Sequence, residues 1–197
     1  MKKIGILSSH NGSGFDTIVT SCENKQLNAQ VVVVISNNSN ALVLQKAQQK
    51  NIPNFVINTN LYPQENLDEK ITLLLQEYGC DIIFLSGYMK KIEDKLLQAY
   101  PNAIINSHPA LLPKFGGVGM YGSKVHEAVI QAKEKQSGCT VHFVNEEYDK
   151  GEYIVQNSIE LEKNETVESL ENKIKKLESV TIIEALNKLF EQSKGFK

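Results

Sequence analysis

Short apolar runs alternate with polar, helix-like segments along the first hundred residues. The apolar runs are continuous, which is typical of strands buried on both faces of a parallel sheet. Predicted strands cover residues 2–8, 31–35, 54–57, 81–85 and 103–105. Predicted helices cover residues 15–23, 41–50, 67–78 and 92–99, the third with Leu73, Leu74 and Leu75 facing inward. This order predicts an α/β fold whose parallel strands are joined by right-handed crossovers.

The pattern changes in the second half, where two strands follow each other with little between them and should pair antiparallel. The predicted elements are a glycine-rich loop at 116–122, a helix at 124–133, strands at 139–144 and 153–161, and a helix at 166–192 that has Thr166 as its N-cap. Because no repeat or linker separates the halves, we expect one domain over residues 1–197, with halves 1–100 and 101–197. The predicted sheet is mostly parallel, has antiparallel strands in its C-terminal half, and carries helices on both faces.

Size and charge exclude several classes of function. A chain of 197 residues suits one well-buried domain, and a net charge of −2 offers no electrostatic footprint for nucleic acid. No stretch is long and apolar enough to cross a membrane, and the apolar run at the N-terminus is too short for a signal peptide. We therefore expect a cytoplasmic protein without nucleic-acid or membrane partners. Its expected partners are small-molecule substrates, and the sequence leaves open whether it is a monomer or a homodimer.

Two residue types constrain the chemistry. Cys22, Cys80 and Cys139 are odd in number and widely spaced, so we expect reduced structural thiols and no metal site. All basic residues are lysines, since the chain contains no arginine. Phosphate or carboxylate groups must therefore be bound by lysine, backbone amides or neutral polar groups, without a bidentate guanidinium.

Asn106-Ser107-His108-Pro109, with Asp149 downstream, is the most informative segment. The apolar run at 103–105 delivers Asn106 and His108 at the carboxyl end of a predicted strand, where ligands bind in open α/β sheets. An amide can donate to a developing oxyanion, an imidazole exchanges protons near neutral pH, and a carboxylate orients the imidazole and holds its charge. Acyl transfer to an amine can use all three groups.

Each candidate also has a purely structural interpretation. Asp149 fits a turn-forming aspartate, and His108 alone fits a surface histidine after a strand. His142, in the middle of a predicted strand, fits a packed or hydrogen-bonded role better than catalysis. The turn at residues 9–14 joins a strand to a helix, so it is either a tight connection or a site for an anion such as phosphate.

Together, these residues resemble the folate-dependent formyltransferases. The matching elements occur in family order over nearly the whole chain, and they are Asn11-Gly12-Ser13, Gly87-Tyr88-Met89, Asn106-Ser107-His108-Pro109-Ala110-Leu111-Leu112-Pro113, Val141-His142-Phe143-Val144, and Asp149 before Gly151. The third element with a downstream Asp is highly specific for this superfamily. The resemblance implies a single-domain, Rossmann-like formyltransferase fold. It is closest to the branch that transfers the formyl group of 10-formyltetrahydrofolate, a co-substrate, to the amine of N1-(5-phospho-D-ribosyl)glycinamide in purine biosynthesis, without a metal.

The resemblance also implies roles for individual residues. Asn106, His108 and Asp149 are the implied catalytic trio. The residues implied for the ribonucleotide and its phosphate are Asn11, Gly12, Ser13, Gly14, Lys175 and Glu178. Those implied for the folate are Met89, Lys90, Ile92, Val144, Asn145, Glu146 and Glu147. We also expect a cis peptide between Leu112 and Pro113, as in the resembling enzymes.

Three departures from the family pattern concern binding residues more than the trio. Gly14 stands where many members have Asn, Lys90 and Gln64 fall near positions where some members use Arg against the folate tail, and the glycine-rich loop is longer than in the short-loop members. We do not expect the extra C-terminal domain of the methionyl-tRNA formyltransferases or the N-terminal one of the formyltetrahydrofolate hydrolases. The alternatives are another N-formyltransferase that uses this donor, for example one acting on an amino sugar nucleotide, a hydrolase of the donor, and a ligand-binding module without activity.

Overall fold

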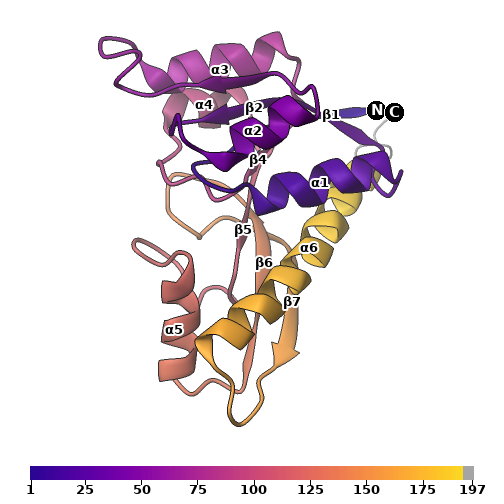
Figure 1. Ribbon diagram of the computed structural model, residues 1–197, viewed down its shortest axis with the longest axis vertical. Coiled ribbons are helices and arrows are strands. Elements are labelled where there is room, and N and C mark those ends of the chain that lie inside the picture. The colour runs from indigo at the N-terminus through magenta and orange to yellow at the C-terminus, as the bar shows by residue number, and fades with distance from the viewer. Residues whose placement is uncertain (193–197) are drawn as a thin grey trace. The chain divides into compact units, whose positions relative to one another are not determined.

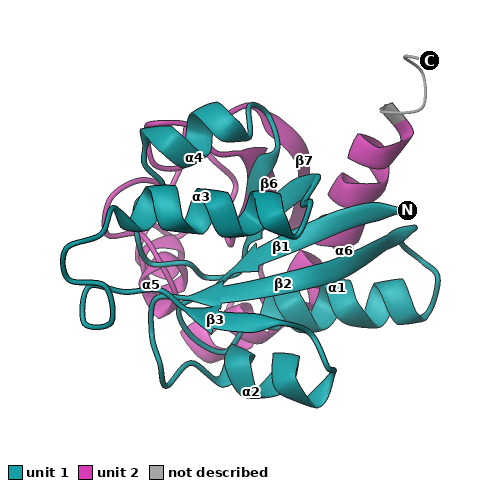
Figure 2. Cartoon of the chain, turned by 90° about the horizontal axis from the view of Figure 1, so that it is seen from above, with its two compact units in different colours: residues 1–105 teal, residues 106–197 magenta. Residues whose placement is uncertain are grey.

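The computed structural model (Figure 1) describes residues 1–192. Its strands follow the order β3-β2-β1-β4-β5-β6-β7. The strands are β1 (Lys2–Leu7), β2 (Ala29–Ser36), β3 (Asn54–Val56), β4 (Ile82–Leu85), β5 (Ile104–His108), β6 (Gln136–Phe143) and β7 (Tyr153–Glu160). The helices are α1 (Ser13–Glu23), α2 (Leu42–Gln49), α3 (Leu67–Glu77), α4 (Asp94–Ala99), α5 (Ser123–Gln131) and α6 (Val167–Gln192). Residues 1–105 and 106–197 form two compact units (Figure 2), so β5 contributes residues to both.

The first unit is built around parallel strands. β1 pairs in parallel with β2 and β4, and β2 pairs in parallel with β3. α1 and α2 lie on one side of these strands, and α3 and α4 on the other (Figure 2). The fully buried side chains include Ile4, Ile6, Val33, Ile83 and Phe84. Cover on both faces explains why the apolar runs of this half are continuous, as predicted.

One predicted detail of α3 is wrong. Leu75 is fully buried, but Leu73 is 60% exposed. A helix turns by about 100° per residue, so three successive side chains cannot all point inward. Ile71, Thr72 and Leu75 instead provide its buried face.

The second unit contains the antiparallel pair predicted from the sequence. β6 and β7 pair from Gln136 opposite Glu160 to His142 opposite Tyr153. The long helix α6 packs against both strands and against α5 (Figure 1). Its N-cap is also as predicted, because Thr166 Oγ1 accepts a hydrogen bond from Ser169 N at 3.2 Å. Thr166 N donates to Ser169 Oγ at 3.1 Å, so a serine takes the place of the usual glutamate in a reciprocal cap.

Candidate active site

The end of β5 and the turn after β6, both in the second unit, bring the predicted catalytic trio together. His108 Nδ1 lies 3.5 Å from Asp149 Oδ2. Asn106 Nδ2 lies 3.3 Å from His142 Nε2, which is itself 3.5 Å from Asp149 Oδ1. The carboxylate of Asp149 therefore faces two imidazoles, and His142 connects it to the amide of Asn106.

His142 belongs to this cluster, although its position in a strand favoured a structural role. Its Nδ1 lies 2.8 Å from the carbonyl oxygen of Phe143. A carbonyl oxygen only accepts, so this contact assigns the proton of the neutral ring to Nδ1. Nε2 then accepts from Asn106, and when protonated it can donate to Asp149. In the sequence, the place of His142 in the Val-His-Phe-Val element was the feature that pointed to the site.

The loop after β5 contacts both ends of the His108–Asp149 pair. His108 Nε2 lies 2.7 Å from the carbonyl oxygen of Phe115, which assigns a proton to Nε2. Gly117 N donates to Asp149 Oδ2 at 2.8 Å. A Cβ on Gly116 would lie 2.5 Å from Leu112 Cδ2 and 3.2 Å from Asp149 Cβ, so a larger residue would have to displace both side chains. The cis peptide predicted between Leu112 and Pro113 is present in this loop.

Burial determines the net shift of the His108 pKa. It lowers the pKa of His108, although the charge of Asp149 and the carbonyl of Phe115 act in the opposite direction. The attraction of Asp149 for a charged ring therefore does not set the net direction, because an imidazolium that is 3% exposed loses most of its hydration. Burial also acts to raise the pKa of Asp149, but the N–H of Gly117 and the two facing imidazoles, which attract the carboxylate when they carry a proton, outweigh it and lower that pKa. At neutral pH the pair is a neutral imidazole beside a carboxylate.

The loop predicted to bind phosphate lies in the first unit at the N-terminus of α1. Gly12 is the N-cap with a φ of 68°, and Ser13 and Gly14 begin the helix, where N–H groups have no partner inside the helix. A Cβ on Gly12 would lie 2.5 Å from Val43 Cγ2, and one on Gly14 would collide with the ring of Phe84. The departure from Asn at Gly14 thus has a structural cause, since α1 packs too closely on β4 for a side chain there.

A lysine that the sequence did not single out also contacts this loop. Lys46 of α2 donates to the carbonyl oxygen of Asn11 at 2.8 Å and forms an ion pair with Asp16 of α1. The lysine predicted for the phosphate, Lys175, lies on α6 with its ammonium 2.6 Å from the carboxylate of Glu171. Both lysines therefore have carboxylate partners.

The residues predicted for the folate are placed at strand ends. In the first unit, Met89 N donates to Ser9 Oγ at 2.8 Å, while the Met89 side chain is 40% exposed. Lys90 and Ile92 line a cavity of about 330 Å³, together with the half-buried Tyr88. In the second unit, residues 144–147 directly follow β6. Their turn is held by a hydrogen bond from Glu147 N to Asn145 Oδ1 at 3.0 Å.

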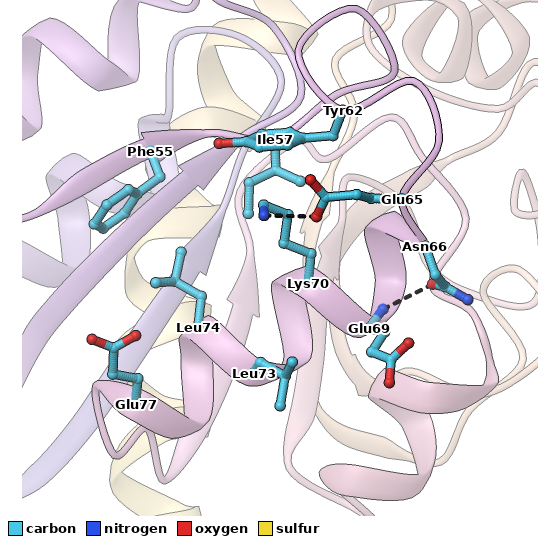
Figure 3. A pocket seen from close by; sticks show the side chains of 10 residues that line it. All are labelled: Phe55, Ile57, Tyr62, Glu65, Asn66, Glu69, Lys70, Leu73, Leu74 and Glu77. Atoms are coloured by element: carbon cyan, nitrogen blue, oxygen red, sulfur yellow. Dashed lines mark hydrogen bonds and ion pairs between the residues drawn. The ribbon is translucent and has the colours of Figure 1, made fainter.

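A separate groove of about 470 Å³ lies in the first unit between β3 and α3 (Figure 3). Phe55, Leu73 and Leu74 provide its apolar wall, so the outward-facing Leu73 contributes to this groove. Lys70 Nζ lies 4.0 Å from the centre of the Tyr62 ring and 2.7 Å from Glu65. The residues that line this groove include none of the predicted site residues.

Comparison with known proteins decides the family. The sequence profile named Formyl transferase matches residues 2–186. The chain belongs to the formyl transferase family. It is 36% identical over 179 residues to the phosphoribosylglycinamide formyltransferase of Bacillus subtilis, covering 90% of this chain and 89% of that protein. It is also 36% identical over 198 residues to the chloroplastic phosphoribosylglycinamide formyltransferase of Arabidopsis thaliana, where it covers 97% of this chain and 66% of that protein.

Solved structures agree with this assignment. The crystal structure of glycinamide ribonucleotide transformylase 1 from Symbiobacterium toebii has a TM-score of 0.89 and 32% identity, and covers 98% of this chain and 89% of that chain. The phosphoribosylglycinamide formyltransferase from Bacillus halodurans also has a TM-score of 0.89, with 31% identity. This match covers 99% of this chain and 98% of that chain. The predicted family, α/β fold and formyl-transferring activity are confirmed. Over the residues that the structure describes, no helix is long and apolar enough to cross a membrane.

Proposed function

We propose that this chain transfers the formyl group of 10-formyltetrahydrofolate to the primary amine of N1-(5-phospho-D-ribosyl)glycinamide, in the cytoplasm, as a step of purine biosynthesis. The observation that carries the proposal is the cluster in which Asp149 faces both His108 and His142, with Asn106 bonded to the latter. The name of the B. subtilis relative, phosphoribosylglycinamide formyltransferase, supports the choice of acceptor.

The residues of the cluster account for the charge that develops in this reaction. The amine nitrogen attacks the formyl carbon, and the formyl oxygen becomes an oxyanion. Asn106 donates to this oxygen, since its amide has a second N–H besides the one that faces His142. The Nε2–H of His108 donates to the carbonyl oxygen of Phe115 in this structure. It becomes a second donor to the formyl oxygen when it leaves that carbonyl.

The same residues move the proton. The amine loses a proton to the His108–Asp149 pair, in which the unprotonated nitrogen of the neutral ring is Nδ1, facing Asp149. The charge of Asp149 stabilises the imidazolium that forms. The proton then passes to N10 of the folate as the bond between N10 and the formyl carbon breaks. The products are the N-formyl amine and tetrahydrofolate.

The remaining predicted residues bind the two substrates. The backbone N–H groups of Ser13 and Gly14 would hold the phosphate, because the start of α1 favours an anion and the chain has no arginine for this role. Lys175 and Glu178 would contact the ribonucleotide. Met89, Lys90 and Ile92, with the backbone of residues 144–147, would bind the folate.

One experiment tests the proposal. The purified chain is incubated with 10-formyltetrahydrofolate and the ribosyl glycinamide, and the N-formyl product and tetrahydrofolate are measured by mass spectrometry. We expect both products in equal amounts, and only when both substrates are present. Formate released without an amine would indicate a hydrolase of the donor instead. Transfer to an amino sugar nucleotide but not to the ribonucleotide would indicate a different acceptor.

A further inference from the structure

Ser107 lies between two members of the trio but faces the other way. Successive side chains of a strand point to opposite faces of the sheet. Asn106 and His108 reach His142 and Asp149, whereas Ser107 Oγ donates a hydrogen bond of 2.5 Å to Glu178 Oε1 on α6. The short segment 106–108 therefore connects the catalytic cluster with a carboxylate on the opposite face of β5.

The carboxylate of Glu178 can accept more hydrogen bonds than it does here. A carboxylate has two oxygens and about four acceptor positions. Among the described residues, Ser107 is the one that donates a hydrogen bond to this carboxylate. The ammonium of Lys175, one turn away, pairs with Glu171 instead. Oε2 of Glu178 is thus open to a donor from a ligand, and the side chain is only partly buried.

The ionisation of Glu178 depends on few neighbours. Burial raises its pKa, while the hydrogen bond from Ser107 and the charge of Lys175 act to lower it. From β6, the thiol of Cys139 faces the same carboxylate and stays neutral, because burial raises its own pKa well above the usual value. From α5, His126 interacts with Glu171 and Lys175. Ser107 is therefore the one uncharged donor that directly favours the ionised form.

We propose that Ser107 is a positioning residue for the acceptor substrate: it holds the Glu178 carboxylate in a fixed orientation, with Oε2 open to a hydroxyl or N–H donor of the ribonucleotide. The backbone of residues 106–108 then fixes the position of that carboxylate relative to Asn106 and His108. Ser107 thus affects where the amine lies against the trio without taking part in the chemistry. This inference rests on the proposed function, because it assumes a ribonucleotide acceptor.

A double-mutant cycle tests the coupling. We expect Ser107→Ala to raise the KM for the ribonucleotide about tenfold, the scale of a lost hydrogen bond to a charged group, and to leave the KM for 10-formyltetrahydrofolate unchanged. Glu178→Gln should raise the same KM, and adding Ser107→Ala to it should have little further effect. Ser137→Ala is the matched control, because its buried hydroxyl on β6 has no hydrogen-bond partner among the described residues. An equal effect of Ser107→Ala in both backgrounds would overturn the proposal.

A pH readout separates this role from a general loss of stability. Without the Ser107 hydroxyl, Glu178 should ionise at higher pH, so the acidic limb of kcat/KM for the ribonucleotide should move up by about one pH unit. Carbon-13 NMR of the glutamate carboxyls, assigned with Glu178→Gln, should show the same shift without any substrate. An unchanged titration of Glu178 would reject the role of Ser107 even if KM rises. A wild-type chain that fails to formylate the ribonucleotide would refute the proposed function alone, since the carboxyl titration still decides the role of Ser107.

Discussion

His108 meets a carboxylate on one ring nitrogen and a backbone carbonyl on the other, and it is almost fully buried. The identity of His108 and Asp149 as partners could be predicted from the sequence, because the motif places both after strand ends. The direction of the shift in the His108 pKa could not be predicted, since burial of the ring is a property of the folded chain. The contact of His142 with Asp149 could not be predicted either, because the Val-His-Phe-Val element marks the residue but the contact depends on the position of β6 beside Asp149.

At the residue scale, His108→Ala and Asp149→Asn should each lower kcat by roughly 10²- to 10⁴-fold, the range for lost acid–base and oxyanion groups. His108→Ala removes the proton acceptor, and Asp149→Asn removes the charge that stabilises its protonated form. Steady-state kinetics with both substrates checks this, and the KM values should change far less than kcat. If either variant kept near-normal turnover, the assignment of that residue would be wrong.

A second prediction at this scale concerns stability below neutral pH. Burial lowers the folded-state pKa of His108 and His126 from their usual value of 6.5. The unfolded chain therefore binds protons more readily just below pH 6.5, so the free energy of unfolding should fall as pH drops from 6.5 towards the folded-state values. Urea denaturation at a series of pH values measures this slope. His108→Gln should reduce this slope, because it removes one of these two buried imidazoles.

At the scale of elements, the start of α1 depends on space as well as on backbone angle. Gly12→Val would place a branched side chain against Val43 at a φ of 68°, which β-branched residues avoid. We expect the KM for the ribonucleotide to rise more in Gly12→Val than in Lys175→Ala, because Lys175 supplies only a point charge and is already paired with Glu171. The KM for the folate should stay constant in both variants. A larger effect of Lys175→Ala would argue against binding through the backbone of this loop.

The loop after β5 allows a second prediction for an element. Gly116→Ala should lower kcat by displacing Asp149, since the new Cβ would lie 3.2 Å from Asp149 Cβ and closer still to Leu112. Gly119→Ala is the matched control, because a Cβ there meets no atom within 4 Å, although its φ of 86° adds some strain. Kinetics of both variants, with circular dichroism to confirm folding, would compare them. Equal activities would show that Asp149 tolerates the displacement.

At the scale of the whole molecule, local sequence patterns and long-range contacts differ in what they reveal. The strand and helix order follows from runs of apolar residues, and the cap at Thr166 follows from its neighbours. The hydrogen bond from Ser107 to Glu178 joins residues that are 71 positions apart, so no local pattern could indicate it. The ion pair between Lys175 and Glu171 is local, and its spacing of four residues in a helix could have indicated it.

Binding of the ribonucleotide should stabilise the whole native chain, because a ligand that binds only the folded state adds free energy through mass action. At a concentration about 100 times its Kd, the gain is about 2.7 kcal/mol. For a chain of this size, that corresponds to a rise of roughly 5–10 °C in Tm. Differential scanning calorimetry should show this rise for the wild type and lose it for Gly12→Val, while 10-formyltetrahydrofolate still raises the Tm of both. A full ribonucleotide shift in Gly12→Val would mean that the phosphate binds away from α1, and it would remove the support that this loop gives to a phosphorylated acceptor.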